Sequence, residues 1–445
     1  MMSAMKDSQQ IFPPLNPDHY QWKKSKSSSG WERPALAAET MWIQKPKEYQ
    51  QLFLAASLTL LRPVSRYKFC SAARHSWIRL RYETPDIDVT AKMTDEGQAY
   101  MYAHVLRNHA EAARWSRQTL FLDNADEEVG FGAVKNKLLL DQAAVQCSSP
   151  ISILLVTIND GDDVVRKVEL ILNVEHQITD GIGIRILLSK YLYILAKNAL
   201  KSDMSQDTSR IDWGENSKLL TTPWICSLNE DQIFSGPEYE EAVSWNQKFM
   251  FEKMVSHLPP TPSFYHSFLL TGEVQYKNVG LGLLRKTESS QKHHFITFTQ
   301  SRSNKILHAI KTILSPEANI THLGHAAMVL ALLRNATVPE LQLVSENTVL
   351  YSPCWINGRR YIRNTDAQLP ATKSFIPICQ TFAPIIFPNL RDLVLHRNAT
   401  QVEMKSKLLK ACEIAKEQYG NIKRTKSIMP ESVAVLEFMG SKMYE

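Results

Sequence analysis

The stretch Ile151–Gly181, ISILLVTINDGDDVVRKVELILNVEHQITDG, decides how this chain folds, because strand-type and helix-type patterns meet inside it. Residues 151–158 form an apolar run rich in β-branched side chains. A turn signal separates them from a second such run at 164–174, which predicts a β-hairpin. Between 181 and 200, apolar side chains recur at helical spacing and predict an amphipathic helix. The sequence therefore places His176 on a loop between a strand and a helix.

His176-Gln-Ile-Thr-Asp180-Gly181 carries residues that suit acid–base chemistry. Near pH 7 a neutral imidazole can take a proton from a hydroxyl and return it to a leaving group. Asp180 falls in the first turn of the expected helix, where a negative charge suits the helix dipole. It could orient the imidazole directly, or turn away and hold the loop through an arginine. We expect Gly181 to allow tight backbone packing where strand and helix meet. A lone histidine is usually structural, but the full pattern at this junction favours a functional site.

The chain has 445 residues, which is more than one compact core usually holds. Strand and helix patterns are mixed throughout, so we expect an α/β or α+β protein. Polar, irregular sequence near 201–223 indicates a domain boundary. The expected organisation is a weakly ordered segment at 1–30, an N-terminal lobe at 31–215 and a C-terminal lobe at 216–445.

Other segments give weaker predictions. Those expected to be helical are 49–61, 97–116, 301–313, 321–333 with Thr321 as its cap, and 401–419 ended by Gly420; the expected strands are 293–299 and 347–355.

Composition excludes several classes of protein. The formal net charge of +6 mildly favours anionic ligands but is too small and dispersed to indicate nucleic-acid binding. The apolar runs 52–61 and 326–333 are shorter than the roughly 20 residues that a membrane helix needs. Six scattered cysteines without a C-x-x-C pattern indicate reduced thiols, and no signal peptide pattern opens the sequence, so we expect a cytoplasmic location.

Alternative chemistries find little support in the sequence. His322 and His325 lie three apart on an expected helix and could share a metal, but no third ligand follows at a recognisable spacing, and we expect no metal site. The chain has no G-x-S-x-G pattern, which argues against an acyl-serine hydrolase.

The H-x-x-x-D-G pattern at His176 resembles the signature of the coenzyme A-dependent acyltransferase superfamily. That superfamily includes chloramphenicol acetyltransferase, plant BAHD acyltransferases, condensation domains and fungal trichothecene acetyltransferases. The chain length and the helix around Thr321-His-Leu-Gly-His-Ala-Ala-Met are also similar. The resemblance is closest to the fungal trichothecene 15-O-acetyltransferases. It implies two chloramphenicol acetyltransferase-like lobes, each a mixed sheet flanked by helices, with the active site in a tunnel between them.

The resemblance also implies roles for individual residues. His176 would deprotonate an acceptor alcohol, which attacks the thioester of acetyl-CoA directly, without an acyl-enzyme. Asp180 would turn away and pair with an arginine of an N-x-R segment, which Trp355-Ile-Asn-Gly-Arg359-Arg360 matches. Arg359 is the expected partner, with Arg360 as the alternative. The implied acceptor is a fungal sesquiterpenoid, at the C-15 hydroxyl of a trichothecene. Acetyl-CoA would be a co-substrate, no cofactor is expected to be bound, and a monomer is favoured.

Two departures from the family pattern keep alternatives open. A D-F-G-W-G motif is not found in the second half of the chain, so the residues that bind coenzyme A stay unassigned. Glu175 stands where condensation enzymes carry the first histidine of H-H-x-x-x-D-G. A condensation-type enzyme that forms amides or esters is therefore the second hypothesis. A catalytically silent binding protein on the same scaffold is the third.

Overall fold

The computed structural model describes residues 15–25, 30–45, 47–95, 97–145, 148–159, 163–199, 211–249, 269–270, 298–335, 349–363, 370–396 and 398–434. The chain forms two compact units. The first unit comprises Met1–Trp245, Ile356–Thr381 and Lys426–Glu445, and the second comprises Asn246–Trp355 and Phe382–Thr425. The lobe boundary expected after residue 215 stays a prediction.

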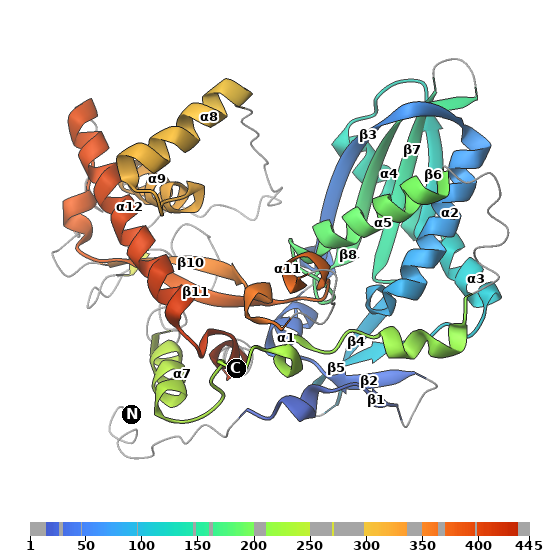
Figure 1. Cartoon of the computed structure of the whole chain (residues 1–445), viewed down its shortest axis with the longest axis horizontal. Helices are drawn as coiled ribbons and strands as arrows, with labels where there is room; N and C mark the ends of the chain where they lie inside the picture. Colours follow the sequence, from blue (N-terminus) through green and yellow to red (C-terminus); the bar gives the residue numbers. More distant parts are fainter. Residues whose placement is uncertain are drawn as a thin grey trace, which may run out of the picture. The chain divides into compact units, whose positions relative to one another are not determined.

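The main sheet of the first unit has the strand order β3-β8-β7-β6 (Figure 1). Its strands are β3 (Gln51–Ser65), β6 (Leu120–Ala125), β7 (Ile151–Asn159) and β8 (Val164–Glu175). β8 pairs antiparallel with both β3 and β7, while β6 runs parallel to β7. The predicted hairpin is therefore confirmed in its two strands, and its turn at 160–162 lies outside the described residues.

Helices cover both faces of this sheet. α2 (Arg66–Glu83), α3 (His109–Thr119) and α5 (Gly183–Ala199) lie on one face, and α4 (Phe131–Ala144) lies on the other. Alternation along β7 explains this arrangement, because Ile153 belongs to the core of the first face and Leu154 to the core of the second. The predicted helix at 181–200 is confirmed as α5, whose apolar side chains are buried against the sheet.

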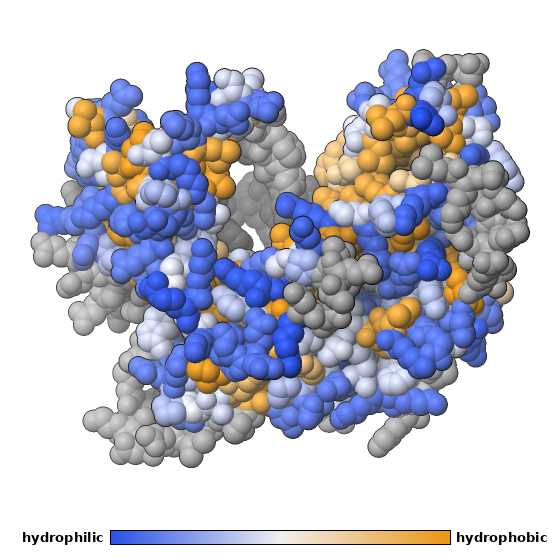
Figure 2. Space-filling view, viewed as in Figure 1, coloured by the Kyte–Doolittle hydropathy of each residue, from blue (hydrophilic) through white to orange (hydrophobic). Residues whose placement is uncertain are grey.

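The helix predicted at 49–61 is wrong, because this segment forms β3. Its apolar run satisfies both helical and strand periods, and pairing of Gln51–Thr59 with β8 selects the strand. Leu52, Leu54 and Leu58 pack against the core of the first face, while alternate side chains point away from it. Leu61 is fully exposed, and Figure 2 shows apolar surface over this strand.

The helix predicted at 97–116 is only partly right. Ala99–Ala103 forms strand β5, with alternate side chains buried, and α3 begins after Asn108, whose side chain accepts from the backbone N–H of Glu111. β5 belongs to a smaller sheet of order β1-β2-β5-β4, built from β1 (Lys23–Lys24), β2 (Trp31–Pro34) and β4 (Val89–Met93).

Short helices connect these parts of the first unit. They are η1 (Pro17–Tyr20), α1 (Ala37–Ile43), η2 (Lys47–Tyr49), η3 (Pro85–Asp88), η4 (Trp213–Leu219), η5 (Trp224–Ser227), η8 (Gly358–Tyr361) and α11 (Ala371–Ser374); α7 (Pro237–Phe249) spans the end of the first segment of this unit. Of the predicted weakly ordered segment 1–30, residues 1–14 and 26–29 lie outside the described residues.

The second unit is mainly helical in its described part. It contains α8 (Gln300–Ala309), η7 (Ile310–Leu314), α9 (Ile320–Asn335), η9 (Leu390–Leu393) and α12 (Gln401–Arg424). A sheet of order β11-β10-β9 is formed by β9 (Leu269–Leu270), β10 (Val349–Asn357) and β11 (Gln380–Phe387), and the chain passes between the units within β10 and β11.

The elements predicted at 301–313, 321–333 and 347–355 are confirmed, with two corrections nearby. The cap of α9 is Asn319 rather than Thr321, since its side-chain oxygen accepts from the N–H groups of Thr321 and His322. α12 does not end at Gly420, because Ile422 is buried beyond it and its packing outweighs the low helix propensity of glycine. Residues 293–297 of the strand predicted at 293–299 lie outside the described residues. None of the described helices is both long and apolar enough to span a membrane.

Candidate active site

The loop that carries His176 begins where β8 ends and is fixed by its own backbone. The N–H of His176 donates to the carbonyl of Gln50, 2.5 Å away, at the start of β3. The N–H of Ile178 turns back to the carbonyl of Glu175 at 3.0 Å. The chain therefore turns tightly between Glu175 and Ile178, in the loop that the sequence predicts between strand and helix.

Asp180 is buried and makes four hydrogen bonds. Its Oδ1 accepts from the backbone N–H groups of Ile182 (3.0 Å) and Gly183 (2.9 Å), which caps the first turn of α5. Its Oδ2 accepts from the backbone N–H of Cys379 and from Arg359 Nη1, both at 2.9 Å. Of the two geometries that the sequence left open, the structure contains the second, in which Asp180 pairs with an arginine.

Arg359 lies in η8, directly after β10, and its side chain is fully buried. Besides Asp180, Nη1 donates to Asn357 Oδ1 at 3.3 Å. The remaining acceptors are backbone carbonyls. Nε donates to the carbonyl of Phe375 at 2.7 Å, and Nη2 donates to those of Ile376 at 3.3 Å and Pro377 at 2.9 Å. A guanidinium has five N–H donors, so each has an acceptor here.

Arg360, the alternative partner, is exposed. Its guanidinium lies over the ring of Tyr361 at 5.1 Å from the centroid. The structure therefore brings Asp180 together with Arg359 and not with Arg360.

The close packing predicted at Gly181 is found instead at Gly183. A Cβ added at Gly181 would meet no atom within 4 Å. A Cβ at Gly183 would lie 2.1 Å from both the carbonyl oxygen of Ile376 and the hydroxyl of Thr179. The sequence signal that was available is the second glycine of Asp180-Gly-Ile-Gly183, which the expected motif did not include.

Thr179 is a second residue that the sequence reasoning missed. It is fully buried, and its hydroxyl donates to the carbonyl of Ile376 at 2.6 Å. Next to it, the carbonyl of Ile178 accepts from the N–H of Ile378 at 3.0 Å. The His176 loop and the segment around 375–379 are thus held together by backbone, hydroxyl and charged hydrogen bonds within the first unit.

The ring of His176 is half-buried and stacks on the indole of Trp42. The ring centroids are 3.7 Å apart and the planes differ by 11°. His176 Nδ1 is buried and has no hydrogen-bond partner in the described part of the chain. Trp42 comes from α1, far earlier in the sequence, and no local pattern indicates this contact.

The surroundings of the imidazole favour its neutral form. Burial lowers the pKa of His176 from its ordinary value of 6.5. The charge of Asp180 and the backbone carbonyls of His176 and Thr179 offset part of this effect. A neutral imidazole is the form that can accept a proton.

Glu175 precedes His176 and is also partly buried, which raises the pKa of its carboxyl group. It accepts a hydrogen bond of 2.5 Å from Gln177 Nε2, and Lys47 Nζ lies 3.9 Å away. These contacts hold Glu175 at the base of the loop. The partner of the Glu175 carboxylate is thus the side chain of Gln177 and not the ring of His176.

His322 and His325 lie on α9 in the second unit. His322 Nδ1 accepts from the N–H of Asn319 at 3.3 Å, and His325 Nε2 lies 3.1 Å from the hydroxyl of Tyr419. Each ring therefore has a protein partner, and the two histidines serve the packing of α9 against α12.

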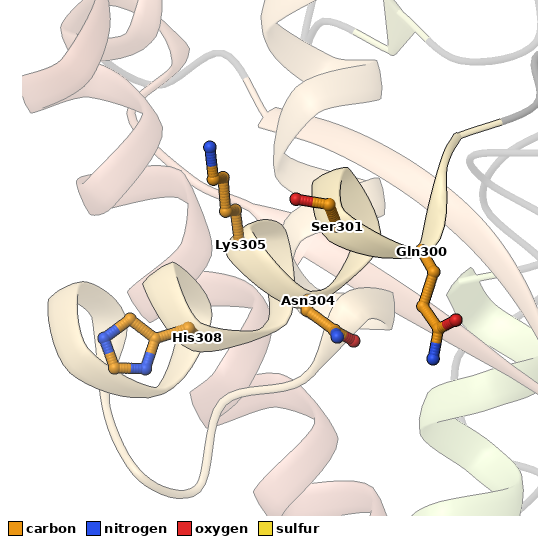
Figure 3. A pocket seen from close by; sticks show the side chains of 5 residues that line it. All are labelled: Gln300, Ser301, Asn304, Lys305 and His308. Atoms are coloured by element: carbon orange, nitrogen blue, oxygen red, sulfur yellow. The ribbon is translucent and has the colours of Figure 1, made fainter.

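A separate hollow lies on α8 of the second unit (Figure 3). Its five lining residues are polar and all come from this one helix: Gln300, Ser301, Asn304, Lys305 and His308. It contains none of the predicted site residues. Within the described residues, Asp180 of the His176 loop and Arg359 are the predicted site residues that share a hydrogen bond.

Comparison with known proteins places the chain in a family. A family model described as 15-O-acetyltransferase Tri3 matches residues 12–271 and 265–440. The chain is 25% identical over 402 residues to the trichothecene O-acetyltransferase TRI3 of Trichoderma arundinaceum, covering 87% of this chain and 71% of that protein. It is 24% identical over 434 residues to the trichothecene 15-O-acetyltransferase TRI3 of Fusarium sporotrichioides, covering 94% of this chain and 76% of that protein.

Solved structures show the same fold. The TRI3 trichothecene 15-O-acetyltransferase of Fusarium sporotrichioides superposes with a TM-score of 0.76 at 21% identity, covering 97% of this chain and 81% of that one. The first condensation domain of the calcium-dependent antibiotic synthetase gives 0.50 at 10% identity, covering 88% and 74%. The fold class expected from the resemblance, mixed sheets flanked by helices, is confirmed.

Proposed function

The chain belongs to the 15-O-acetyltransferase Tri3 family and is an acetyl-transferring enzyme, and we propose that it transfers the acetyl group of acetyl-CoA to the C-15 hydroxyl of a trichothecene. In this proposal His176 is the general base. The acceptor is suggested by the names of the relatives. The observation that carries the proposal is a half-buried imidazole, with a pKa that burial lowers, on a loop that a buried ion pair holds in place.

The proposed reaction needs one base and no covalent intermediate on the protein. His176 takes the proton of the acceptor hydroxyl while the hydroxyl oxygen attacks the carbonyl carbon of the thioester. The tetrahedral intermediate then expels the thiolate of coenzyme A, and the C–S bond breaks. The imidazolium returns the proton to the thiolate sulfur. Because Nδ1 is buried, Nε2 is the nitrogen that we assign to this proton transfer.

Asp180 and Arg359 support the loop in this proposal and do not touch the substrates. All four hydrogen bonds of Asp180 go to other groups, so it does not orient the imidazole directly. Their contribution to turnover would come through the position of His176, since misplacing a catalytic group by about 1 Å can lower a rate by about 100-fold.

The test compares His176→Ala with a control, His75→Ala, using acetyl-CoA and a panel of hydroxylated trichothecenes. His75 is also half-buried, in α2 of the same unit, where its Nδ1 lies 2.8 Å from the carbonyl of Ser71. Loss of a general base should reduce turnover by about 100- to 10,000-fold. The control should keep its activity, and both variants should unfold at similar temperatures. Near-normal turnover by His176→Ala would exclude the proposed base.

The two other hypotheses predict different products in the same assay. A condensation-type enzyme would acylate amine acceptors, so the panel includes amino analogues of the alcohols. A silent binding protein would yield no acetylated product with any acceptor. A mass gain of one acetyl group on an alcohol alone supports the proposed O-acetyl transfer.

A further inference from the structure

The contact between Trp42 and His176 is the closest stacked ring pair among the described residues, at 3.7 Å and 11°. Both rings are half-buried, and each buries a nitrogen, Trp42 Nε1 and His176 Nδ1, that has no hydrogen-bond partner in the part of the chain described. A histidine that acts as a base is commonly held in orientation by a hydrogen bond to its second nitrogen. The backbone carbonyls of His176 and Thr179 interact with the ring, but Nδ1 itself has no hydrogen bond among the described residues.

Asp180 cannot replace this restraint, because its oxygens are engaged by α5, Arg359 and Cys379. The backbone of His176 is fixed through its N–H, but this bond does not restrain the side chain. Stacking on the indole gives the ring a contact over one whole face, which defines the plane of the imidazole. One face of the ring is covered by the indole, so a substrate can approach only its edge or its other face.

Trp42 is itself held by both ends of α1. At the start of the helix, buried Glu39 accepts from the backbone N–H of Leu36 at 2.7 Å and from Arg33 Nη1 and Nη2 at 2.8 and 2.6 Å. At its end, Gln50 Nε2 donates to the carbonyls of Ile43 at 3.2 Å and Lys45 at 2.5 Å.

Gln50 connects this helix to the histidine. Its side chain holds the end of α1, while its backbone carbonyl accepts the N–H of His176 at 2.5 Å. One buried residue therefore contacts both the end of α1, next to Trp42, and the backbone of His176.

We propose that Trp42 is a positioning residue for the reaction, which defines the plane of the His176 imidazole and directs Nε2 toward the acceptor hydroxyl. The inference rests on the proposed function of His176. It assigns a role to α1, which carries no residue of the H-x-x-x-D-G pattern.

The experiment compares Trp42→Phe and Trp42→Leu with Trp115→Phe. Phenylalanine keeps a flat ring against the imidazole, whereas leucine fills the space without one. Trp115 is a matched control, because it stacks on Trp77 at 5.4 Å and 12° in the core of the same unit. For each variant we measure kcat, KM for acetyl-CoA and for the acceptor, and the thermal unfolding temperature.

A loss of position should lower kcat of Trp42→Leu by about 10- to 100-fold. Both KM values should stay within about twofold, because Trp42 acts on the base and not on binding. Trp42→Phe should recover most of the loss, since aromatic stacking is retained. Trp115→Phe should keep the kcat and both KM values of the parent protein. Unchanged kcat for Trp42→Leu, a change in KM alone, or equal losses for the Phe and Leu variants would overturn the proposal.

A second measurement reads the stack without relying on activity. In the NMR spectrum of the parent protein, the ring protons of His176 should lie upfield of the other histidines because of the indole ring current, with the assignment made by His176→Ala. Trp42→Leu should remove this shift. An unshifted His176 signal in the parent would overturn the inference. If His176→Ala stays active while the parent protein shows the upfield shift, His176 is not the base, although its ring does stack on Trp42.

Discussion

Replacing Asp180 with alanine tests how the His176 loop is held. The carboxylate is buried, and its four hydrogen bonds join α5, η8 and the start of the segment that leads into β11. The substitution removes all four at once. It also leaves the charge of Arg359, whose side chain is fully buried, without a counter-charge.

The magnitude follows from the kind of pair that is broken. Removing one partner of a buried ion pair typically costs about 3–5 kcal/mol, because the other charge stays desolvated. The N-cap of α5 adds about 1 kcal/mol. Arg359 keeps its carbonyl acceptors at Phe375, Ile376 and Pro377, which limits the loss. We therefore expect the free energy of unfolding to fall by about 4 kcal/mol.

Urea unfolding followed by circular dichroism measures this change, with Asp123→Ala as the control. Asp123 makes an ion pair with Lys137 at 3.3 Å in the same unit, but both side chains are well exposed, at 36% and 42%. Exposed pairs contribute at most about 1 kcal/mol. If Asp180→Ala and Asp123→Ala unfold at the same urea concentration, the loop does not depend on its buried ion pair and the reasoning is refuted.

Three further predictions concern the same network. Gly183→Ala should lose about 3 kcal/mol of stability by overpacking, while Gly181→Ala, with open space around it, should not; similar urea midpoints would contradict the packing argument. The value of kcat/KM should fall as the pH drops through the lowered pKa of His176, so the acid limb of the pH profile should have its midpoint below pH 6.5. A midpoint above pH 6.5 would exclude His176 as the titrating base. Arg359→Lys should lower the free energy of unfolding by about 2 kcal/mol, since an ammonium has three N–H donors in place of the five of the guanidinium. An unchanged urea midpoint would show that the loop does not need all five hydrogen bonds.

Local patterns predicted the elements that carry the site. The hairpin of β7 and β8 and the helix α5 follow from β-branched runs and helical spacing, and these alone place His176 on a loop and Asp180 at a helix start. The partner of Asp180 came from an N-x-R segment identified by resemblance. Its long separation in sequence means that no periodicity could have paired the two residues.

The errors arose where tertiary contacts decide between equal local readings. Residues 51–61 suit either a helix or a strand, and only pairing with β8 settles the choice. Trp42 and Thr179 carry no local signal, because their roles depend on a ring and a carbonyl brought from elsewhere in the chain. Gly183 was visible in the sequence, but the reason for a glycine there is the carbonyl of Ile376, which only the fold supplies.

The chemistry of the network explains why its sequence signature is so short. Arg359 finds its acceptors mainly in backbone carbonyls of Phe375, Ile376 and Pro377, and Asp180 accepts mainly from backbone N–H groups. Backbone groups are present whatever the side chain, so these positions impose little on residue identity beyond their conformation. Only groups that act through their side chains, namely the carboxylate, the guanidinium and the imidazole, have to be specified. The chain is identical to two of its relatives at only about one position in four. By the same argument Trp42, which acts through its ring, has to be specified too, so replacing it with a side chain that lacks a flat ring should lower kcat by about 10- to 100-fold.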